Sequence, residues 1–182
     1  SRLHLEKSSE LEKENSPAIL IWPIEKQPKI LAITTTGRVA LVRWEFAGQS
    51  PGLIEKFLPG GLEGEKLLNL IPLPNNEKVT LGLLSSDGRF KRLGIEEVTD
   101  LSGRAATILK LKNGVTLKTA LICQPNGEVA IISSFGRILR LQISEESMPL
   151  MGKLAQGPIT MRTFPEETII GAVSSFKEIE NH

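Results

Sequence analysis

Residue types that commonly carry catalysis are scarce in this sequence. The two histidines, His4 and His182, stand at opposite ends of the chain, and the only cysteine, Cys123, lies in an apolar run. Serines are plentiful, but no internal histidine is available to activate one as a nucleophile. A lone cysteine in apolar surroundings is typical of a small buried side chain. It also excludes an intrachain disulfide and a cysteine-based metal cluster.

The acidic residues offer little acid–base chemistry. Glu96 and Glu97 are adjacent in sequence, and so are Glu166 and Glu167. Neighbouring residues on a strand point to opposite faces of a sheet, so these pairs are poor acid–base partners. Glycine-rich dinucleotide and P-loop motifs are absent from the sequence. We therefore expect no catalytic residue, no metal site and no cofactor in this chain.

The basic residues have a distribution that suggests binding to a polyanion. The net charge is only +1, but residues 89–140 carry nine basic and four acidic residues. Beyond Leu141 the balance reverses, with three basic and six acidic residues. A nearly neutral protein can still present a basic face. The alternative is that these charges are simply the solvated faces of strands.

The composition predicts one turn-rich domain. The 182 residues are 40% hydrophobic and include 16 glycines and 11 prolines, which favours turns over long helices. No run approaches 18 apolar residues and the first residues lack the apolar core of a signal peptide, so we expect a cytoplasmic protein. The expected organisation is a tail or linker at residues 1–16, a domain at 17–176 and a second tail at 177–182.

Three segments share one pattern that predicts a repeated β-hairpin. Each has an apolar strand, two or three hydroxyl residues, one variable residue, the pair Gly-Arg and a second strand. The copies are residues 30–43, 81–93 and 129–141, and their glycines are 51 and 48 residues apart. The x-Gly pair favours a type I′ turn. A fourth copy begins at residues 169–176 and has Lys177 where Gly-Arg would stand.

Smaller signals predict further strands between the hairpins. Asn-Gly turns at 113–114 and 126–127 make residues 107–141 resemble four short strands, and glycine-containing loops precede expected strands at 67–71, 107–111 and 158–162. About four strands per 40–50 residues is typical of a propeller blade. Trp22 and Trp44 are either core anchors or exposed stacking platforms, and we favour the core.

The hairpins resemble those of the C-terminal domains of DNA gyrase A and its topoisomerase IV counterpart. The segment Ser85-Ser86-Asp87-Gly88-Arg89-Phe90-Lys91-Arg92 is the best match, and residues 151–173 resemble a passage of the family's late blades. The resemblance spans residues 28–176. It implies an all-β propeller-like fold, the β-pinwheel, of four-stranded blades. This chain would hold three to four blades of the family's six.

The resemblance also implies a function. Domains of this family bind and bend double-stranded DNA on a basic outer rim, as modules of a bacterial, nucleoid-associated type II topoisomerase (an isomerase). The parent would use ATP and Mg through other domains or subunits, which would be this chain's partners. Arginine and lysine can neutralise phosphates without reading bases. The residues expected to bind DNA are Arg89, Lys91, Arg92, Arg104, Lys110, Lys112, Arg137 and Arg140.

Three departures from the family pattern qualify these expectations. Residues 59–64 keep the glycines of gyrase's Gln-Arg-Arg-Gly-Gly-x-Gly box but have an acid, Glu63, where a base is expected, so we expect weaker wrapping. The chain has no tyrosine, so it cannot form a topoisomerase's covalent link to DNA. An incomplete ring would expose blade edges, so we expect either a homodimer through its ends or a cap made by the N-terminal tail. An alternative function is a propeller-like scaffold that binds protein partners and not DNA.

Overall fold

The computed structural model describes residues 2–3, 20, 22–23, 26–101 and 103–175. The expected tails at 1–16 and 177–182 lie outside these residues, except that Arg2–Leu3 forms a short strand, β1. The described residues are mostly strands and loops, and no helix among them is long and apolar enough to cross a membrane. The short helical segments are α1 (Glu96–Thr99) and 3-10 turns at Trp44–Phe46 and Ile54–Phe57.

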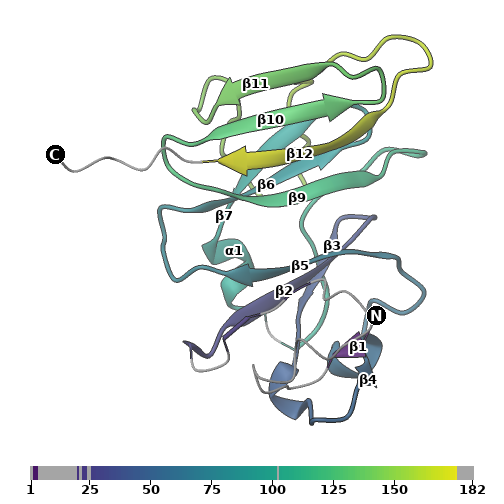
Figure 1. The fold of residues 1–182 in the computed structure, drawn as a ribbon, viewed down its shortest axis with the longest axis vertical. Coiled ribbons are helices and arrows are strands. Elements are labelled where there is room, and N and C mark those ends of the chain that lie inside the picture. The colour runs from purple at the N-terminus through teal and green to yellow at the C-terminus, as the bar shows by residue number, and fades with distance from the viewer. Residues whose placement is uncertain (1, 4–19, 21, 24–25, 102, 176–182) are drawn as a thin grey trace, which may run out of the picture.

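Three antiparallel sheets are stacked on one another, and we call them blades 1, 2 and 3 in chain order (Figure 1). Blade 1 contains, from its inner to its outer edge, β5 (Leu67–Leu73), β2 (Lys29–Thr34), β3 (Arg38–Leu41) and β8 (Ala106–Thr107). Blade 2 contains β9 (Leu117–Cys123), β6 (Thr80–Ser85) and β7 (Phe90–Gly94). Blade 3 contains β12 (Ile169–Ser175), β10 (Glu128–Ser133) and β11 (Ile138–Gln142). The predicted all-β blade fold is confirmed.

Each blade is completed by strands from the following repeat. The hairpin β2–β3 pairs with β5 at its inner edge, and β6 and β10 pair in the same way with β9 and β12. All three inner ladders shift register at the same place, next to Thr34, Ser85 and Ser133. At the outer edge of blade 1, β8 pairs with β3. At the outer edge of blade 2, an antiparallel bridge joins Arg89, just before β7, to Ile159. Among the described residues, no strand pairs with the outer edge of β11.

This exchange corrects two predictions about pairing. Residues 107–141 do not form one blade, because β8, β9 and the hairpin β10–β11 belong to blades 1, 2 and 3. The segment interpreted as a fourth copy is β12, which completes blade 3 as β5 and β9 complete the other blades. A glycine turn specifies that the chain reverses direction. It does not specify which distant strand will accept the next segment.

The hairpin turn also differs from the predicted type I′. Gly37, Gly88 and Gly136 have φ between +77° and +83°, whereas the residues before them do not have positive φ. In each turn the glycine N–H donates to the carbonyl three residues earlier. This geometry is a type I turn followed by a left-handed glycine, the usual three-residue hairpin loop. The prediction was wrong because a single glycine supplies only one of the two positive φ angles that type I′ requires.

Three apolar clusters hold the stack together. One lies between blades 1 and 2, with Leu31 and Leu83 from the two sides, and a second lies between blades 2 and 3, with Phe90 and Ile131. Cys123 belongs to the second cluster, and burial raises the pKa of its thiol to about 12, so the prediction of a buried small side chain is confirmed.

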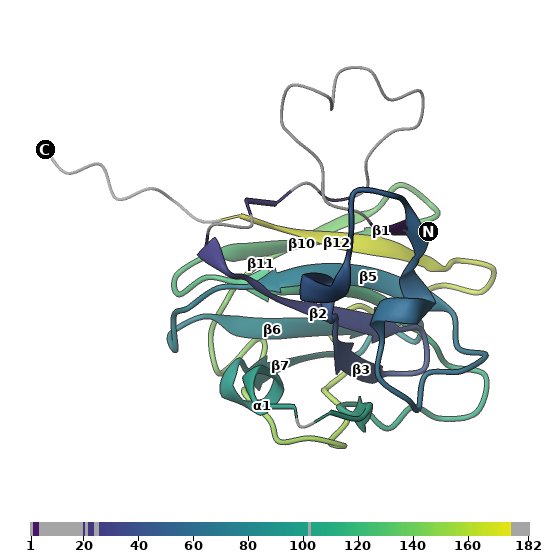
Figure 2. The same ribbon diagram turned by 90° about the horizontal axis from the view of Figure 1, so that it is seen from below.

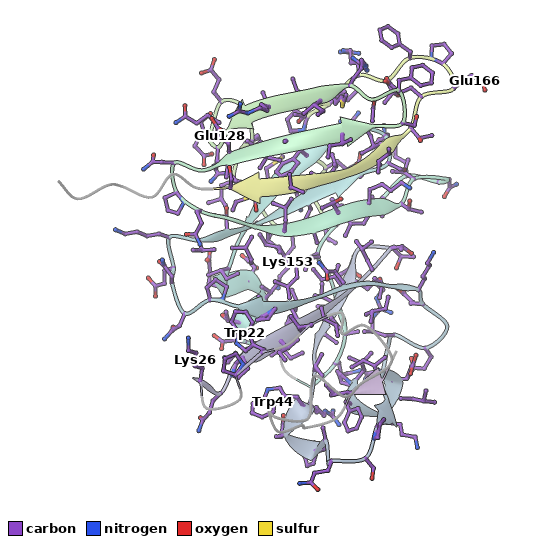
Figure 3. All side chains as sticks on the ribbon, in the orientation of Figure 1. Trp22, Lys26, Trp44, Glu128, Lys153 and Glu166 are labelled. Atoms are coloured by element: carbon purple, nitrogen blue, oxygen red, sulfur yellow. The ribbon has the colours of Figure 1, made fainter. Side chains whose placement is uncertain are left out.

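The third cluster covers the far face of blade 1. There a segment that we call the cap, residues 44–58, lies over β2 and pairs through β4 (Gly52–Leu53) with β1 (Figure 2). Trp44 packs in this cluster and donates its indole N–H to the Pro28 carbonyl at 2.7 Å. Trp22 is 45% exposed, so the core interpretation holds for Trp44 only (Figure 3).

Candidate nucleic-acid interface

The arginine of the third Gly-Arg pair is fastened inside its own blade. Arg137 donates from Nε to Glu167 Oε2 at 2.8 Å and from Nη2 to the Arg162 carbonyl at 2.8 Å, and its guanidinium lies 4.5 Å from the centre of the Phe164 ring. The Glu167 side chain has no exposed surface. The Arg137 hydrogen bonds lower the pKa of that carboxyl to about 2, although burial opposes the shift. The pair of Arg137 with Glu167, which we call a latch, therefore fixes the loop that precedes β12.

The other two Gly-Arg arginines have equivalent roles. In blade 1, Arg38 forms a latch with Glu65, which precedes β5 by two residues as Glu167 precedes β12. In blade 2 that position is Val115, and Arg89 instead lies 3.3 Å from Asp87 and donates to the Gly157 carbonyl at 3.0 Å. The sequence pattern suggested a rim of phosphate-binding arginines, and the structure shows each of them bonded within the protein.

The Lys-Arg pair of β7 lies beneath another segment. Lys91 is only 1% exposed, and its Nζ donates to the Gly152 carbonyl at 2.9 Å. Burial lowers the pKa of the Lys91 ammonium to about 8, while the charge of Glu97 acts in the opposite direction. Arg92 donates from Nε to the Met148 carbonyl at 2.6 Å and pairs with Glu145. Both side chains attach residues 145–152 to blade 2.

Arg140 has a third kind of environment. Its side chain is 70% exposed and pairs with Glu128 across the hairpin β10–β11. Both residues lie on the face of β10–β11 opposite to Val129 and Ile131, which pack toward blade 2 (Glu128 is labelled in Figure 3). Arg140 is thus accessible, and it lies on β11, the outermost strand of blade 3, with its side chain on the sheet face.

Three of the expected residues are exposed and flank β8, at the outer edge of blade 1, along the chain. Arg104 precedes β8, and Lys110 and Lys112 follow it. The side chains of these three residues have no hydrogen bond or ion pair with another described residue. These cations flank β8, which is the outermost strand of its sheet. Such an edge can neutralise the phosphates of a nucleic acid without contacting its bases.

The structure adds a basic residue that was not among the expected ones. Exposed Arg43 lines a groove of about 260 Å³ together with Arg104, Lys29 and Trp44. Arg43 is the last residue of the first repeat. Its position just after the second hairpin strand was the only feature of the sequence that could have indicated a place in this basic group. Elsewhere in the described part, no group of three or more His, Cys, Asp or Glu could hold a metal ion.

Comparison with known proteins places this geometry in a fold family. No family model matches the sequence. The chain is 29% identical over 109 residues to the A-type subunit of DNA topoisomerase 4 from Synechocystis sp., and 25% identical over 109 residues to that of DNA gyrase from Ureaplasma parvum. These matches cover 55% and 60% of this chain but only 12% and 13% of the two relatives.

Solved structures give the longer match. The C-terminal domain of DNA topoisomerase IV superimposes with a TM-score of 0.70 at 15% identity, and that of DNA gyrase A with 0.67 at 17%. The E. coli ParC C-terminal domain has a TM-score of 0.56 at 12% identity and 60% coverage of that chain. This chain has their β-pinwheel fold. The first two matches cover 82% and 81% of this chain. They cover 48% and 47% of the two solved domains, so this chain spans about half of their length.

The pinwheel explains why basic residues of two kinds occur in one repeat. In this fold a segment of the following repeat lies along the second strand of each hairpin. In blade 2 the side chains of β7 therefore bond to that segment within the protein. Side chains that flank the outer segment itself, such as Arg104, remain in solvent. The resemblance of the hairpins to this family is confirmed. The assignment of individual DNA contacts stays a prediction.

Proposed function

We propose that this chain is a DNA-binding module of a bacterial type II topoisomerase A-type subunit. It holds duplex DNA through phosphates at the outer edge of blade 1. The observation that carries the proposal is a group of three exposed cations, Arg104, Lys110 and Lys112, whose side chains have no hydrogen-bond or ion-pair partner among the described residues. The pinwheel fold shared with the C-terminal domains of topoisomerase IV and gyrase A supports the choice of ligand.

The binding would be electrostatic and independent of base sequence. Each cation that meets a phosphate releases condensed counterions, so affinity falls steeply as salt rises. Bending the duplex costs a few kcal/mol, which further backbone contacts along the domain can offset. Arg43 extends the basic edge toward the groove beside Arg104 and is a candidate for such a contact.

The remaining expected residues have other roles in this proposal. Arg89, Lys91, Arg92 and Arg137 position loops and outer segments, because each is bonded to backbone carbonyls of another segment. They support the DNA-binding edge without contacting phosphates. Arg140 belongs to the outward face of blade 3.

The parent protein would supply the chemistry. DNA cleavage, ATP hydrolysis and Mg binding would belong to other domains or subunits, with which this module would associate in the cytoplasm at the nucleoid. This chain would contribute no catalytic residue, and its lack of tyrosine supports that division of roles. Its part would be to hold and bend the DNA on which the parent acts.

A salt titration of DNA binding tests the proposal. The variant R104A/K110A/K112A should bind duplex DNA more weakly and lower the slope of log K against log salt by about 2.7, at about 0.9 per phosphate contact. The matched control K26A/K56A/K78A removes three exposed lysines elsewhere and should keep the wild-type slope. The variant K91M should also keep it, because the Lys91 ammonium is buried.

Two outcomes would contradict the proposal. Wild-type protein that does not bind duplex DNA at low salt would favour the scaffold alternative. A control triple variant that loses as much slope as R104A/K110A/K112A would mean that binding is diffuse and not located at the edge of blade 1.

A further inference from the structure

The latch carboxylate has the same place in blades 1 and 3. Glu65 and Glu167 each lie two residues before the inner strand of their blade, and each pairs with the arginine of its Gly-Arg pair. In blade 3 the carboxylate accepts hydrogen bonds from the Ser133 hydroxyl at 2.7 Å and from Arg137 Nε at 2.8 Å. A hydroxyl and a guanidinium are therefore arranged to hold an anion at this point of the repeat.

Blade 2 keeps the two donors and lacks the carboxylate. Ser85 and Arg89 have the places of the serine and the arginine of blade 3. The residue two before β9, however, is Val115. A cavity of about 10 Å³ lies there, and Ser85, Arg89 and Val115 are among the residues that line it. A cavity of this size has room for one species about as large as a water molecule.

The donors around this cavity are not fully used within the protein. Arg89 Nε is enclosed and has no hydrogen-bond partner among the described residues, although Asp87 Oδ2 lies 3.3 Å from it. Lys91 also lines the cavity and is 1% exposed. Its ammonium has three hydrogens to donate, and among the described residues it donates to the Gly152 carbonyl. Because a buried donor without an acceptor destabilises the fold, an acceptor is expected in this cavity.

The charge of the lining favours an anion as that acceptor. Lys112, Arg89 and Lys91 all line the cavity, and the one acid among the lining residues is Asp87. The Asp87 carboxylate is already an acceptor for the Ser85 hydroxyl. Three basic residues and one acid leave the surroundings of the cavity positive, which favours an anion over a water molecule or a cation.

We infer that this cavity, which we call the blade 2 anion site, binds a small inorganic anion of the size of chloride. The volume of about 10 Å³ is too small for a phosphate group or a larger acid. In this site Arg89 Nε and the Lys91 ammonium donate to the ion, which takes the part that the Glu167 carboxylate has in blade 3. The ion joins three segments that line the cavity, namely residues 83–91, 109–115 and 156–157. It reaches the site from solvent past the exposed Lys112.

Urea unfolding at constant ionic strength tests the site, with potassium chloride replacing potassium gluconate. Above the dissociation constant, each tenfold rise in chloride should lower the unfolding equilibrium constant of the wild type about tenfold. The variant D87T/V115E gives blade 2 the residues of blade 1, Thr36 and Glu65, so its own carboxylate should remove the chloride dependence. The matched control D87T should keep it, and should bind chloride more tightly because a competing acid is gone.

Bromide soaked into crystals of the wild type gives a direct reading, with an anomalous peak expected beside Arg89 Nε and Val115. Stability of the wild type that is independent of chloride would overturn the inference. A chloride dependence that D87T/V115E shares with D87T would also overturn it, because the effect would then arise elsewhere. Circular dichroism checks that each variant folds, and if D87T/V115E does not, the absence of bromide from the cavity would still overturn the inference. These measurements use no DNA, so their outcome is separate from that of the DNA-binding proposal.

Discussion

Blades 1 and 3 are built from the same hairpin and differ in what covers them. Every residue of β2 after Lys29 is buried, because one face meets blade 2 and the other meets the cap. Along β10, buried and half-buried residues alternate, because only the face toward blade 2 is covered. In these two blades the repeat thus specifies the hairpin, the register shift and the latch. At the far face of blade 1, where no further described blade packs, residues 44–58 close the end of the stack.

The largest expected effect compares equal truncations at the two ends. Ile54 in the cap is 2% exposed, so Ile54→Ala should lower the free energy of unfolding by about 2–5 kcal/mol through lost burial and a cavity. Ile138→Ala removes the same atoms from an exposed side chain and should change the free energy of unfolding by about 0.5 kcal/mol or less. Urea denaturation at low protein concentration measures both, and equal losses would mean that the two ends are covered alike.

A smaller difference is expected at the hairpin glycines. Gly37 and Gly136 both have left-handed φ, so alanine at either should cost about 1–2 kcal/mol from the backbone alone. At Gly37 an added Cβ would lie 2.7 Å from the Leu109 carbonyl oxygen, in the segment that follows β8, whereas at Gly136 it would meet nothing within 4 Å. Gly37→Ala should therefore be the more destabilising in urea. Equal costs would indicate that the segment after β8 yields easily.

The same contrast explains how much the sequence could foretell. The hairpins were predictable because each needs only local signals, such as Ser133, Gly136 and the strands beside them. The partners of β9 and β12 were not, because a turn such as Pro125–Gly127 looks the same whether it joins strands of one sheet or of two. Lys91 was assigned to DNA because residue type alone does not reveal that residues 145–152 cover β7.

The smallest expected effect is a difference between the two latches in how much stability they lose in acid. The pKa of Glu167 is about 2 in the folded protein and near its ordinary 4.5 when unfolded, so its stabilisation is present above pH 4.5 and is lost as the pH falls toward 2. Glu167→Gln should therefore flatten the dependence of unfolding free energy on pH in that range. Glu65 in blade 1 is 18% exposed, against no exposure for Glu167, and its pKa is also lowered, because hydrogen bonds from Thr34, Thr36 and Arg38 outweigh its burial. Glu65→Gln should flatten the curve less, since solvent screens its pair with Arg38. Urea titrations at a series of acidic pH values measure both slopes, and a larger change for Glu65→Gln would place the stronger latch at the capped end.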